Sequence, residues 1–394
     1  MAVGFGLGCL PGLLIGLLLG VGGGVWAWIE FEAAAALDPL SDLGIDQETL
    51  TLDETKAYVD RLAAEHLADP ENVGLVVGVL DGGESRVWGY GRVAQGSRKV
   101  PDGDTLFELA SVGKTFTATV LADMHLRREL SWDDPLEEFL PDGVTVPRHG
   151  TREITLLDLA TQTSGLPALP PNMRFGDPLN PYADYTVEEL YAGLGQITLP
   201  RPPGEGSEYS NLGFGLLGHA LARRADKSYE GLVVERICDP LGMASTRMTL
   251  DAALTSRLAT PHDGGEPVPV WEDTTMPGAG SFLSTADDML KYVAAHWEEP
   301  AEVGSDRHAA LVRAMRETTR KLRPTDVPEQ AVGLGWHIQS ENALDIVWHN
   351  GGAGGSCSYV AFLNQPRVGV VVLSNSRASV DELGRRVLYL LARH

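Results

Sequence analysis

Residues 108–118 read ELASVGKTFTA, and the assignment of the fold depends on this stretch. An apolar run at helical spacing continues from it to Met124, which predicts that Ser111 lies at or near the N-terminus of a helix. Lys114 follows one turn later on the same helix face, within reach of the serine oxygen. Only six lysines occur among the 394 residues, so a serine three positions before a lysine is a scarce pattern in this chain.

The pair Ser111 and Lys114 suits nucleophilic chemistry. A free serine is a weak nucleophile that needs a neighbouring base, and a lysine whose pKa is lowered by burial can act as one. The exposed N–H groups at a helix N-terminus favour developing negative charge nearby. A Ser-x-x-Lys match nevertheless arises by chance about once in a chain of this length, so the pair needs support from other motifs.

Two further motifs follow in order, Tyr-Ser-Asn at residues 209–211 and His-Asn-Gly at residues 349–351. A second His-x-Gly match begins at His262, but it lies in a loop rich in Pro and Gly. His349 instead ends a strand-like run and precedes a glycine-rich segment, which suits an exposed strand edge. Structural alternatives remain for each motif: Tyr209 as a core phenol, Asn211 as a turn or cap residue, and His349 as a hydrogen-bonded residue at a strand end.

Strand patterns occur at both ends of the chain, and the middle is mostly helix and loop. The patterns predict a helix over 51–68, a hairpin of 73–80 and 85–90 with a turn at 81–84, strands at 332–339, 344–349, 358–363 and 368–374, and a closing helix over 380–392. These elements predict an α/β (α+β) protein. Its antiparallel sheet is formed from both ends of the chain and flanked by helices, with a mostly helical insertion at about 105–320.

The N-terminal segment carries no charged side chain from residue 2 to residue 29, which exceeds the roughly 20 residues needed to cross a bilayer. We therefore predict a membrane anchor or signal segment at 1–30, a linker at 31–50 and one catalytic domain at 51–394. A retained transmembrane helix is favoured over a cleaved signal, because a signal has a shorter apolar region and a basic start. Glycines at every fourth residue from 4 to 24 suggest weak self-association through this glycine strip.

Composition excludes several classes of partner and cofactor. A formal charge of −23 argues against binding to nucleic acid. Cys9, Cys238 and Cys357 are isolated from one another and from histidine pairs, so we expect no metal and no cofactor, and free thiols rather than a disulfide.

The ordered motifs resemble those of the serine β-lactamase and penicillin-binding-protein superfamily, in which Ser-x-x-Lys is a signature. The likeness is to the branch with class C β-lactamases, D-alanyl-D-alanine carboxypeptidases and esterases. It covers about residues 50–390, because the segments at 163–167, 240–243 and 284–289 also fit. The resemblance implies that Ser111 is the acylated nucleophile, that Lys114 is its base partner, and that Tyr209 gives and takes protons.

The resemblance also implies roles in substrate binding. Asn211 would orient Lys114 and bind a substrate amide, and His349, Gly351 and Gly352 would line the substrate site. The backbone N–H groups of Ser111 and Gly352 would form an oxyanion hole. The nearby lysine is further expected to ease Tyr209 toward the phenolate, because an opposite charge favours the ionised form.

Two positions depart from the pattern of the superfamily. His349 stands where many members carry lysine, and an imidazole attracts a substrate carboxylate less reliably than a permanent ammonium does. This departure favours peptidase, amidase or esterase activity over dedicated β-lactam hydrolysis. Gln162 stands where relatives often carry histidine, and we expect no catalytic consequence.

The sequence therefore predicts a serine hydrolase that forms an acyl-enzyme with a small-molecule or peptide substrate, namely an amide, an ester or a D-amino-acid peptide. It would be anchored in a membrane with its catalytic domain outside the cytoplasm, or cleaved and exported. One alternative is a class C-like β-lactamase. An alternative of another class is a non-catalytic, membrane-tethered binding or sensor module.

Overall fold

The computed structural model describes residues 52–174 and 176–393. The transmembrane helix predicted for residues 1–30 and the linker predicted for 31–50 lie outside these residues. Within the two described ranges, no helix is both long and apolar enough to span a membrane.

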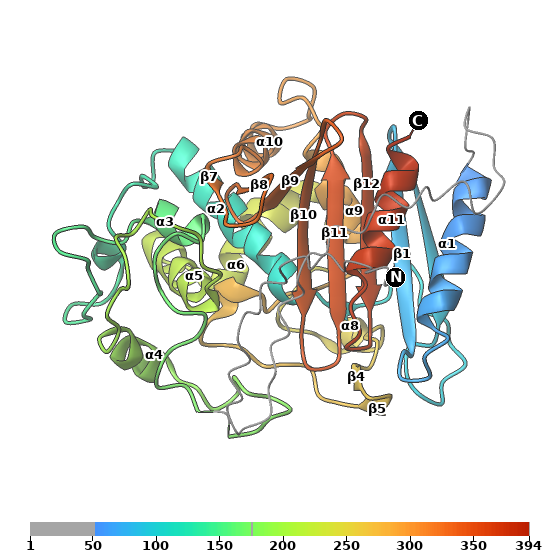
Figure 1. Cartoon of the computed structure of the whole chain (residues 1–394), viewed down its shortest axis with the longest axis horizontal. Helices are drawn as coiled ribbons and strands as arrows, with labels where there is room; N and C mark the ends of the chain where they lie inside the picture. Colours follow the sequence, from blue (N-terminus) through green and yellow to red (C-terminus); the bar gives the residue numbers. More distant parts are fainter. Residues whose placement is uncertain (1–51, 175, 394) are drawn as a thin grey trace, which may run out of the picture. The chain divides into compact units, whose positions relative to one another are not determined.

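An eight-stranded antiparallel sheet forms the centre of the described part of the chain, in the order β2-β1-β12-β11-β10-β9-β8-β7 (Figure 1). The first hairpin pairs directly with the last strand, because β1 lies between β2 and β12. The predicted sheet from both ends of the chain is therefore present. Its strands are β1 (Gly74–Asp81), β2 (Glu84–Gly91), β7 (Arg323–Pro324), β8 (Gln330–Val332), β9 (His337–Glu341), β10 (Leu344–Gly352), β11 (Cys357–Leu363) and β12 (Val368–Ser374).

The two faces of the sheet are both covered, and strand β1 illustrates how. Leu75, Val77 and Val79 point toward α1 (Leu52–His66) and α11 (Asp381–Leu391), whereas Val76 and Leu80 point to the opposite face. On that opposite face, helix α9 (Ala286–Ala295) contacts β1 and β12. A strand buried on both sides reads as a continuous apolar run, which explains the sequence GLVVGVL.

Between residues 105 and 320 the chain is mainly helix and loop, as expected. The remaining elements include a small sheet in which β3 pairs with β6. They are β3 (Phe107–Glu108), α2 (Lys114–Leu126), α3 (Leu156–Ala160), α4 (Val187–Leu194), α5 (Asn211–Ala225), α6 (Tyr229–Val233), α7 (Asp239–Leu241), α8 (Ala252–Thr255), β4 (His262–Asp263), β5 (Glu266–Pro267), β6 (Leu283–Ser284) and α10 (Asp306–Thr318).

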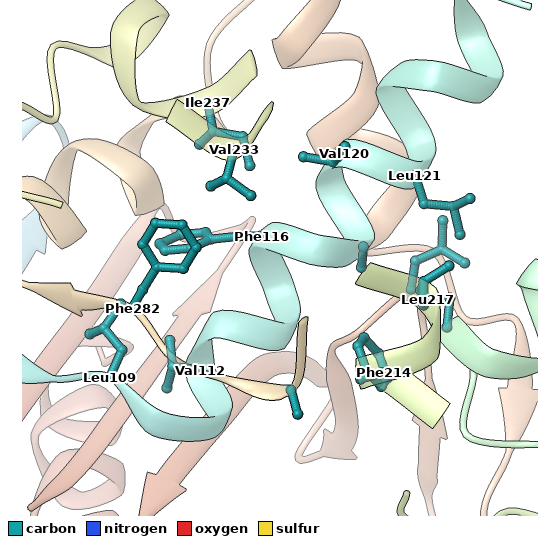
Figure 2. Close-up of a cluster of buried hydrophobic side chains, with 14 of the residues drawn as sticks. Leu109, Val112, Phe116, Val120, Leu121, Phe214, Leu217, Val233, Ile237 and Phe282 are labelled. Atoms are coloured by element: carbon teal, nitrogen blue, oxygen red, sulfur yellow. The ribbon is translucent and has the colours of Figure 1, made fainter. Parts of the chain in front are cut away.

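Helix α2 runs through the interior, and every residue from Lys114 to Met124 is buried. Figure 2 shows the apolar side chains around it, with Phe116 beside Phe282. The Phe116 ring makes edge contacts with Phe282 at 5.5 Å and with Tyr292 at 4.9 Å between ring centroids. The start of α2 is therefore held by a packed core, so the groups it presents have little freedom to move.

Two predicted elements differ from the observed ones because of glycine turns. The hairpin turn is two residues, Gly82 and Gly83, both with positive φ, so the strands extend further than predicted. The strand predicted at 332–339 is instead divided into β8 and β9 by a turn at Gly335, whose φ is +70°. A Cβ there would lie 2.9 Å from the carbonyl oxygen of Lys114, so this turn packs tightly on α2.

Candidate active site

Ser111 lies in a single 3-10 turn, Ala110–Gly113, directly before α2. Ala110 has a φ of 45°, a left-handed conformation that is uncommon for a residue with a side chain. Its carbonyl group lies against Gly280, where a Cβ would fall 2.2 Å from the Ala110 oxygen. The turn is therefore sharp and closely packed, and it places Ser111 at the N-terminal end of the helix, as the sequence predicts.

Lys114 is completely buried and contacts the serine directly. Its Nζ lies 2.9 Å from Ser111 Oγ and donates a hydrogen bond of 2.5 Å to the carbonyl oxygen of Ala279. Burial holds the pKa of Lys114 well below its usual value, and the Asp273 carboxylate acts in the opposite direction but more weakly. Burial thus makes the neutral amine, which is the form that can accept a proton, easier to reach than in an exposed lysine.

Tyr209 completes the cluster from the loop before α5. Its phenol bonds to Ser111, and Lys114 Nζ lies 4.9 Å from the centroid of its ring. The expectation that lysine eases this tyrosine toward the phenolate is wrong, because burial raises the pKa of Tyr209 above its usual value. Burial of the phenol is the larger cause, and the hydrogen bond to Ser111 acts in the opposite direction but more weakly.

The backbone on both sides of Tyr209 is held by Gln162. The Gln162 side-chain oxygen Oε1 accepts a hydrogen bond from Ser210 N at 2.8 Å, and its main-chain oxygen accepts one from Glu208 N, also at 2.8 Å. Gln162 is buried and has a φ of 59°, so it adopts a strained conformation to make this contact. This structural role of Gln162 was not predicted from the sequence, and the expectation that the residue has no catalytic consequence stays a prediction.

Replacing Gln162 with leucine is expected to lower kcat/KM for p-nitrophenyl acetate about tenfold, because the buried Ser210 N–H would lose its acceptor at a cost of about 1–3 kcal/mol. Steady-state kinetics and a melting curve check this prediction. Gln162→Glu is the matched control, since it keeps an acceptor oxygen and should retain most of the activity. Full activity of Gln162→Leu would show that Tyr209 does not need this support.

Asn211 begins helix α5, and Ser210 caps that helix by accepting a bond from Gly213 N. The Asn211 side chain bonds with the phenol of Tyr182, whereas its Oδ1 is buried without a hydrogen-bond partner. Tyr182 comes from the loop before α4, and its ring packs edge-on against Trp271 at 5.4 Å. Asn211 therefore connects the segment that carries Tyr209 to two packed loops, one with Tyr182 and the other with Trp271.

The third motif approaches the serine from strand β10. A Cβ at Gly351 would lie 3.0 Å from Ser111 N and 2.3 Å from the Leu109 oxygen, so only glycine allows the strand to pass this close. Gly352 is exposed, with open space where a Cβ would be. The two glycines therefore bring the C-terminal end of β10 alongside the backbone of Ser111.

His349 and Asn350 point to opposite faces of β10. Asn350 turns away from the serine and donates a hydrogen bond of 2.6 Å from Nδ2 to Asp381 on α11. His349 lies with its ring 6.4 Å from the Tyr209 ring. The rejected candidate His262 is a buried structural residue that accepts a hydrogen bond from Gln95 N.

Four residues near the motifs were not predicted from the sequence. The Asp273 carboxylate acts on the pKa of both Lys114 and Tyr182, and burial raises the pKa of Asp273 itself to about 6. His337 lies 5.2 Å from His349 between ring centroids. Glu108 ties the serine stretch to distant loops, because its carboxylate accepts bonds from Trp271 N and Ser356 Oγ. Asp273 and Tyr182 lie in loops, His337 lies on β9 and Glu108 lies on β3, so the fold and not one local pattern brings these neighbours together.

The cysteines that the structure describes, Cys238 and Cys357, are both buried free thiols, as expected from their isolation in the sequence.

A serine bonded to a buried lysine, at the start of a core helix and beside a tyrosine, defines the class of this protein: it is a serine hydrolase. Residues 59–394 match the family model named beta-lactamase. The chain belongs to this family.

Individual relatives agree with this assignment. The D-alanyl-D-alanine-carboxypeptidase/endopeptidase AmpH of Escherichia coli is 31% identical over 352 residues, which cover 87% of this chain and 90% of that protein. The structure of a β-lactamase/D-alanine carboxypeptidase from Yersinia pestis complexed with citrate matches with a TM-score of 0.73 and 26% identity, over 87% of this chain and 99% of its own. A class C β-lactamase in complex with cefoxitin shares the fold, with a TM-score of 0.74 and 22% identity over 86% and 98% of the two chains.

Proposed function

We propose that the enzyme hydrolyses an ester, an amide or a D-amino-acid peptide through an acyl-enzyme on Ser111. The observation that carries the proposal is the 2.9 Å contact between Lys114 Nζ and Ser111 Oγ, at a lysine that is 0% exposed. Because burial depresses the pKa of Lys114, its neutral amine is available as a base at lower pH than that of an exposed lysine.

Acylation moves the serine proton to the leaving group. Lys114 takes the proton from Ser111 while Oγ bonds to the substrate carbonyl carbon, and the carbonyl electron pair moves onto oxygen. We assign the backbone N–H groups of Ser111 and Gly352 to the stabilisation of this oxyanion. As the bond to the leaving group breaks, Tyr209 donates its proton to that group and regains one from Lys114.

Deacylation repeats these steps with water in place of the serine hydroxyl. Tyr209, with a pKa raised by burial, is protonated at the start, so it acts first as an acid and only transiently as a base. The proton removed from water returns to Ser111 Oγ when the acyl bond breaks, which restores the free enzyme. In this scheme Asn211 binds the amide of the acyl group, and His349 contacts the leaving-group side.

The names of the relatives support a peptide substrate. AmpH is named a carboxypeptidase and endopeptidase, and we propose a small-molecule or peptide substrate of that kind here. The second candidate is a class C-like β-lactamase, favoured by the Yersinia pestis relative, which is named both a β-lactamase and a D-alanine carboxypeptidase. Rapid turnover of a cephalosporin would support this second candidate, and slow, stable acylation would support the first.

Mass spectrometry of the intact protein tests the proposal. The full chain is incubated with a fluorophosphonate or with benzylpenicillin, and the adduct is located by peptide mapping. We expect one adduct of each reagent on Ser111, with the penicillin adduct lost slowly. Esterase activity without any label on Ser111 would contradict the proposal.

We further propose that residues 1–30 anchor the enzyme in a membrane, with the catalytic domain outside the cytoplasm. The support is the uncharged run over residues 2–29, which is long enough to span a bilayer. Retention of the protein in membranes after alkaline carbonate extraction, together with its digestion by external protease, would agree. A soluble product that begins beyond residue 30 would instead indicate the cleaved form. Weak self-association through the glycine strip predicts a cross-linked dimer of the full chain.

A further inference from the structure

Glu108 is a buried acidic residue that the proposed mechanism does not use. It lies on β3, three residues before Ser111, and is 6% exposed. Within the described residues its carboxylate accepts one bond from an N–H group and one from a hydroxyl group, and no Lys, Arg or His side chain pairs with it. Burial raises the pKa of Glu108, and the two bonds act in the opposite direction but more weakly. Burial of a carboxylate without a cation is costly, which points to a role other than folding stability.

One oxygen of Glu108 holds the turn that follows the third motif. Glu108 Oε2 accepts a hydrogen bond of 2.7 Å from Oγ of Ser356, a residue that is 2% exposed. The main-chain oxygen of Ser356 accepts a bond of 2.9 Å from Ala353 N, which closes the turn between β10 and β11. Gly352 is the last residue of β10, so it directly precedes the turn that Glu108 holds.

The other oxygen holds the loop that carries Trp271. Glu108 Oε1 accepts a hydrogen bond of 2.9 Å from Trp271 N. The same loop packs against the turn after β10, because a Cβ at Gly354 would lie 2.5 Å from Trp271 Nε1. The carboxylate therefore joins the turn to the loop and fixes both relative to β3.

The serine stretch contacts the sheet a second time, one residue after Glu108. The carbonyl oxygen of Leu109 accepts a hydrogen bond of 2.7 Å from Ser358 Oγ on β11. Gly351 passes the same oxygen so closely that a Cβ there would fall 2.3 Å from it. Gly352 therefore lies between a residue that packs against Leu109 and a turn that is held by Glu108.

We propose that Glu108 is a positioning residue that sets the distance between the backbone N–H groups of Gly352 and Ser111. The inference rests on the proposed acyl-enzyme function, in which these two groups stabilise the oxyanion. Such donors act over about 2.7–3.1 Å, and a displacement of about 1 Å can cost about 10²-fold in rate. Glu108 itself contacts no reacting atom. It acts through the turn 353–356, which loses its buried acceptor when the carboxylate is removed.

Glu108→Met tests the inference in the full-length protein. Methionine has nearly the same length but accepts neither bond, so we expect kcat for p-nitrophenyl acetate to fall at least about tenfold while KM changes less than about twofold. The effect appears in kcat because the oxyanion forms in the transition state and not on substrate binding. The second-order rate constant for labelling of Ser111 by a fluorophosphonate should fall by about the same factor.

Glu108→Gln is the conservative variant that should rescue the activity. Its amide oxygen can still accept from Trp271 N, and its amide N–H can donate to Ser356 Oγ, so both attachments persist without the charge. We expect its kcat to exceed that of Glu108→Met at least about fivefold. Equal losses of kcat in the two variants would overturn the inference, because the two hydrogen bonds would then not matter.

Glu230→Met is the matched control. The Glu230 carboxylate on α6 also holds a loop, since its Oε1 accepts bonds of 2.7 Å from Met248 N and 2.9 Å from Thr249 N, but it takes no part in the proposed site. This variant should lose stability in a urea unfolding curve and keep its kcat. A folded Glu108→Met enzyme with the kcat of the wild type overturns the inference, whatever its stability.

Ser356→Ala decides the question if Glu108→Met does not fold. It removes only the bond to Oε2 and should lower kcat at least about threefold without a change in KM. A kcat equal to that of the wild type would then overturn the inference. The proposed function is judged separately, because labelling of Ser111 in the wild-type enzyme reports the nucleophile whatever the Glu108 and Ser356 variants do.

Discussion

Substitution of Ser111 by alanine is expected to lower kcat/KM for p-nitrophenyl acetate by at least about 10³-fold, because it removes the nucleophile of the proposed mechanism. The fold should persist, since the smaller side chain takes the place of a hydroxyl whose contacts are to Lys114 and Tyr209. The hydrolysis rate and the fluorophosphonate adduct are measured on the same preparation. Both should be lost together.

Ser281→Ala is the matched control for this experiment. Ser281 Oγ donates to the carbonyl oxygen of Asp273, so it lies in the loop beside the site but takes no part in the proposed mechanism. It should keep the label and most of the activity. Ser111→Ala with wild-type hydrolysis would mean that another residue is acylated, and the assignment of the nucleophile would be wrong.

Replacement of Lys114 by methionine is expected to cost at least about 10³-fold in kcat/KM while making the protein more stable, by an amount on the order of 1 kcal/mol. Methionine fills the buried space of the lysine stem without placing an amine in the core. Activity is lost because Ser111 no longer has a base. Kinetics and a urea unfolding curve measure the two effects.

The stability difference should depend on pH in a defined direction. Burial lowers the folded-state pKa of Lys114 below its unfolded value near 10.5, so between these two pKa values the unfolded chain binds more protons than the folded one. The wild type therefore gains stability as pH rises through this window. Lys114→Met lacks this gain, so its stability advantage is largest at low pH and shrinks toward pH 10.

Lys114→Arg separates charge from base strength, because arginine keeps a positive charge and does not deprotonate. It should be as inactive as the methionine variant and less stable than the wild type. A methionine variant that is both inactive and strongly destabilised would show that the hydrogen bond to Ala279 matters more than the burial of the amine.

The contact between Ser111 and Lys114 could be predicted from sequence because their geometry is local. Three residues separate Ser111 from Lys114, and an apolar helical pattern is enough to bring them onto one face. The strands near both ends of the chain could also be predicted. Uninterrupted apolar runs such as those of β1 and β12 are typical of a sheet that is covered on both faces. Local patterns also separated His349 from His262.

The electrostatics of the site could not be predicted in the same way. The pKa of Tyr209 rises because the folded chain buries its phenol, and the sequence alone does not reveal the depth of that burial. Asp273 and Tyr182 come from separate loops, and they meet the cluster only after the chain has folded. The hydrogen bonds of Gln162 to the backbone beside Tyr209 could not be predicted. They depend on a left-handed backbone conformation at Gln162, which the spacing of residues in the sequence does not encode.

The pairing of β1 with β12 has a consequence for synthesis on the ribosome. These strands lie about 290 residues apart in the chain, so at 5–20 residues per second β1 is made roughly 15–60 s before its partner. During that interval one edge of the first hairpin, which consists almost entirely of valine, leucine and glycine, is open to wrong partners. The sheet can be completed only after β12 has been made, so this edge of β1 stays without its native partner until late in synthesis.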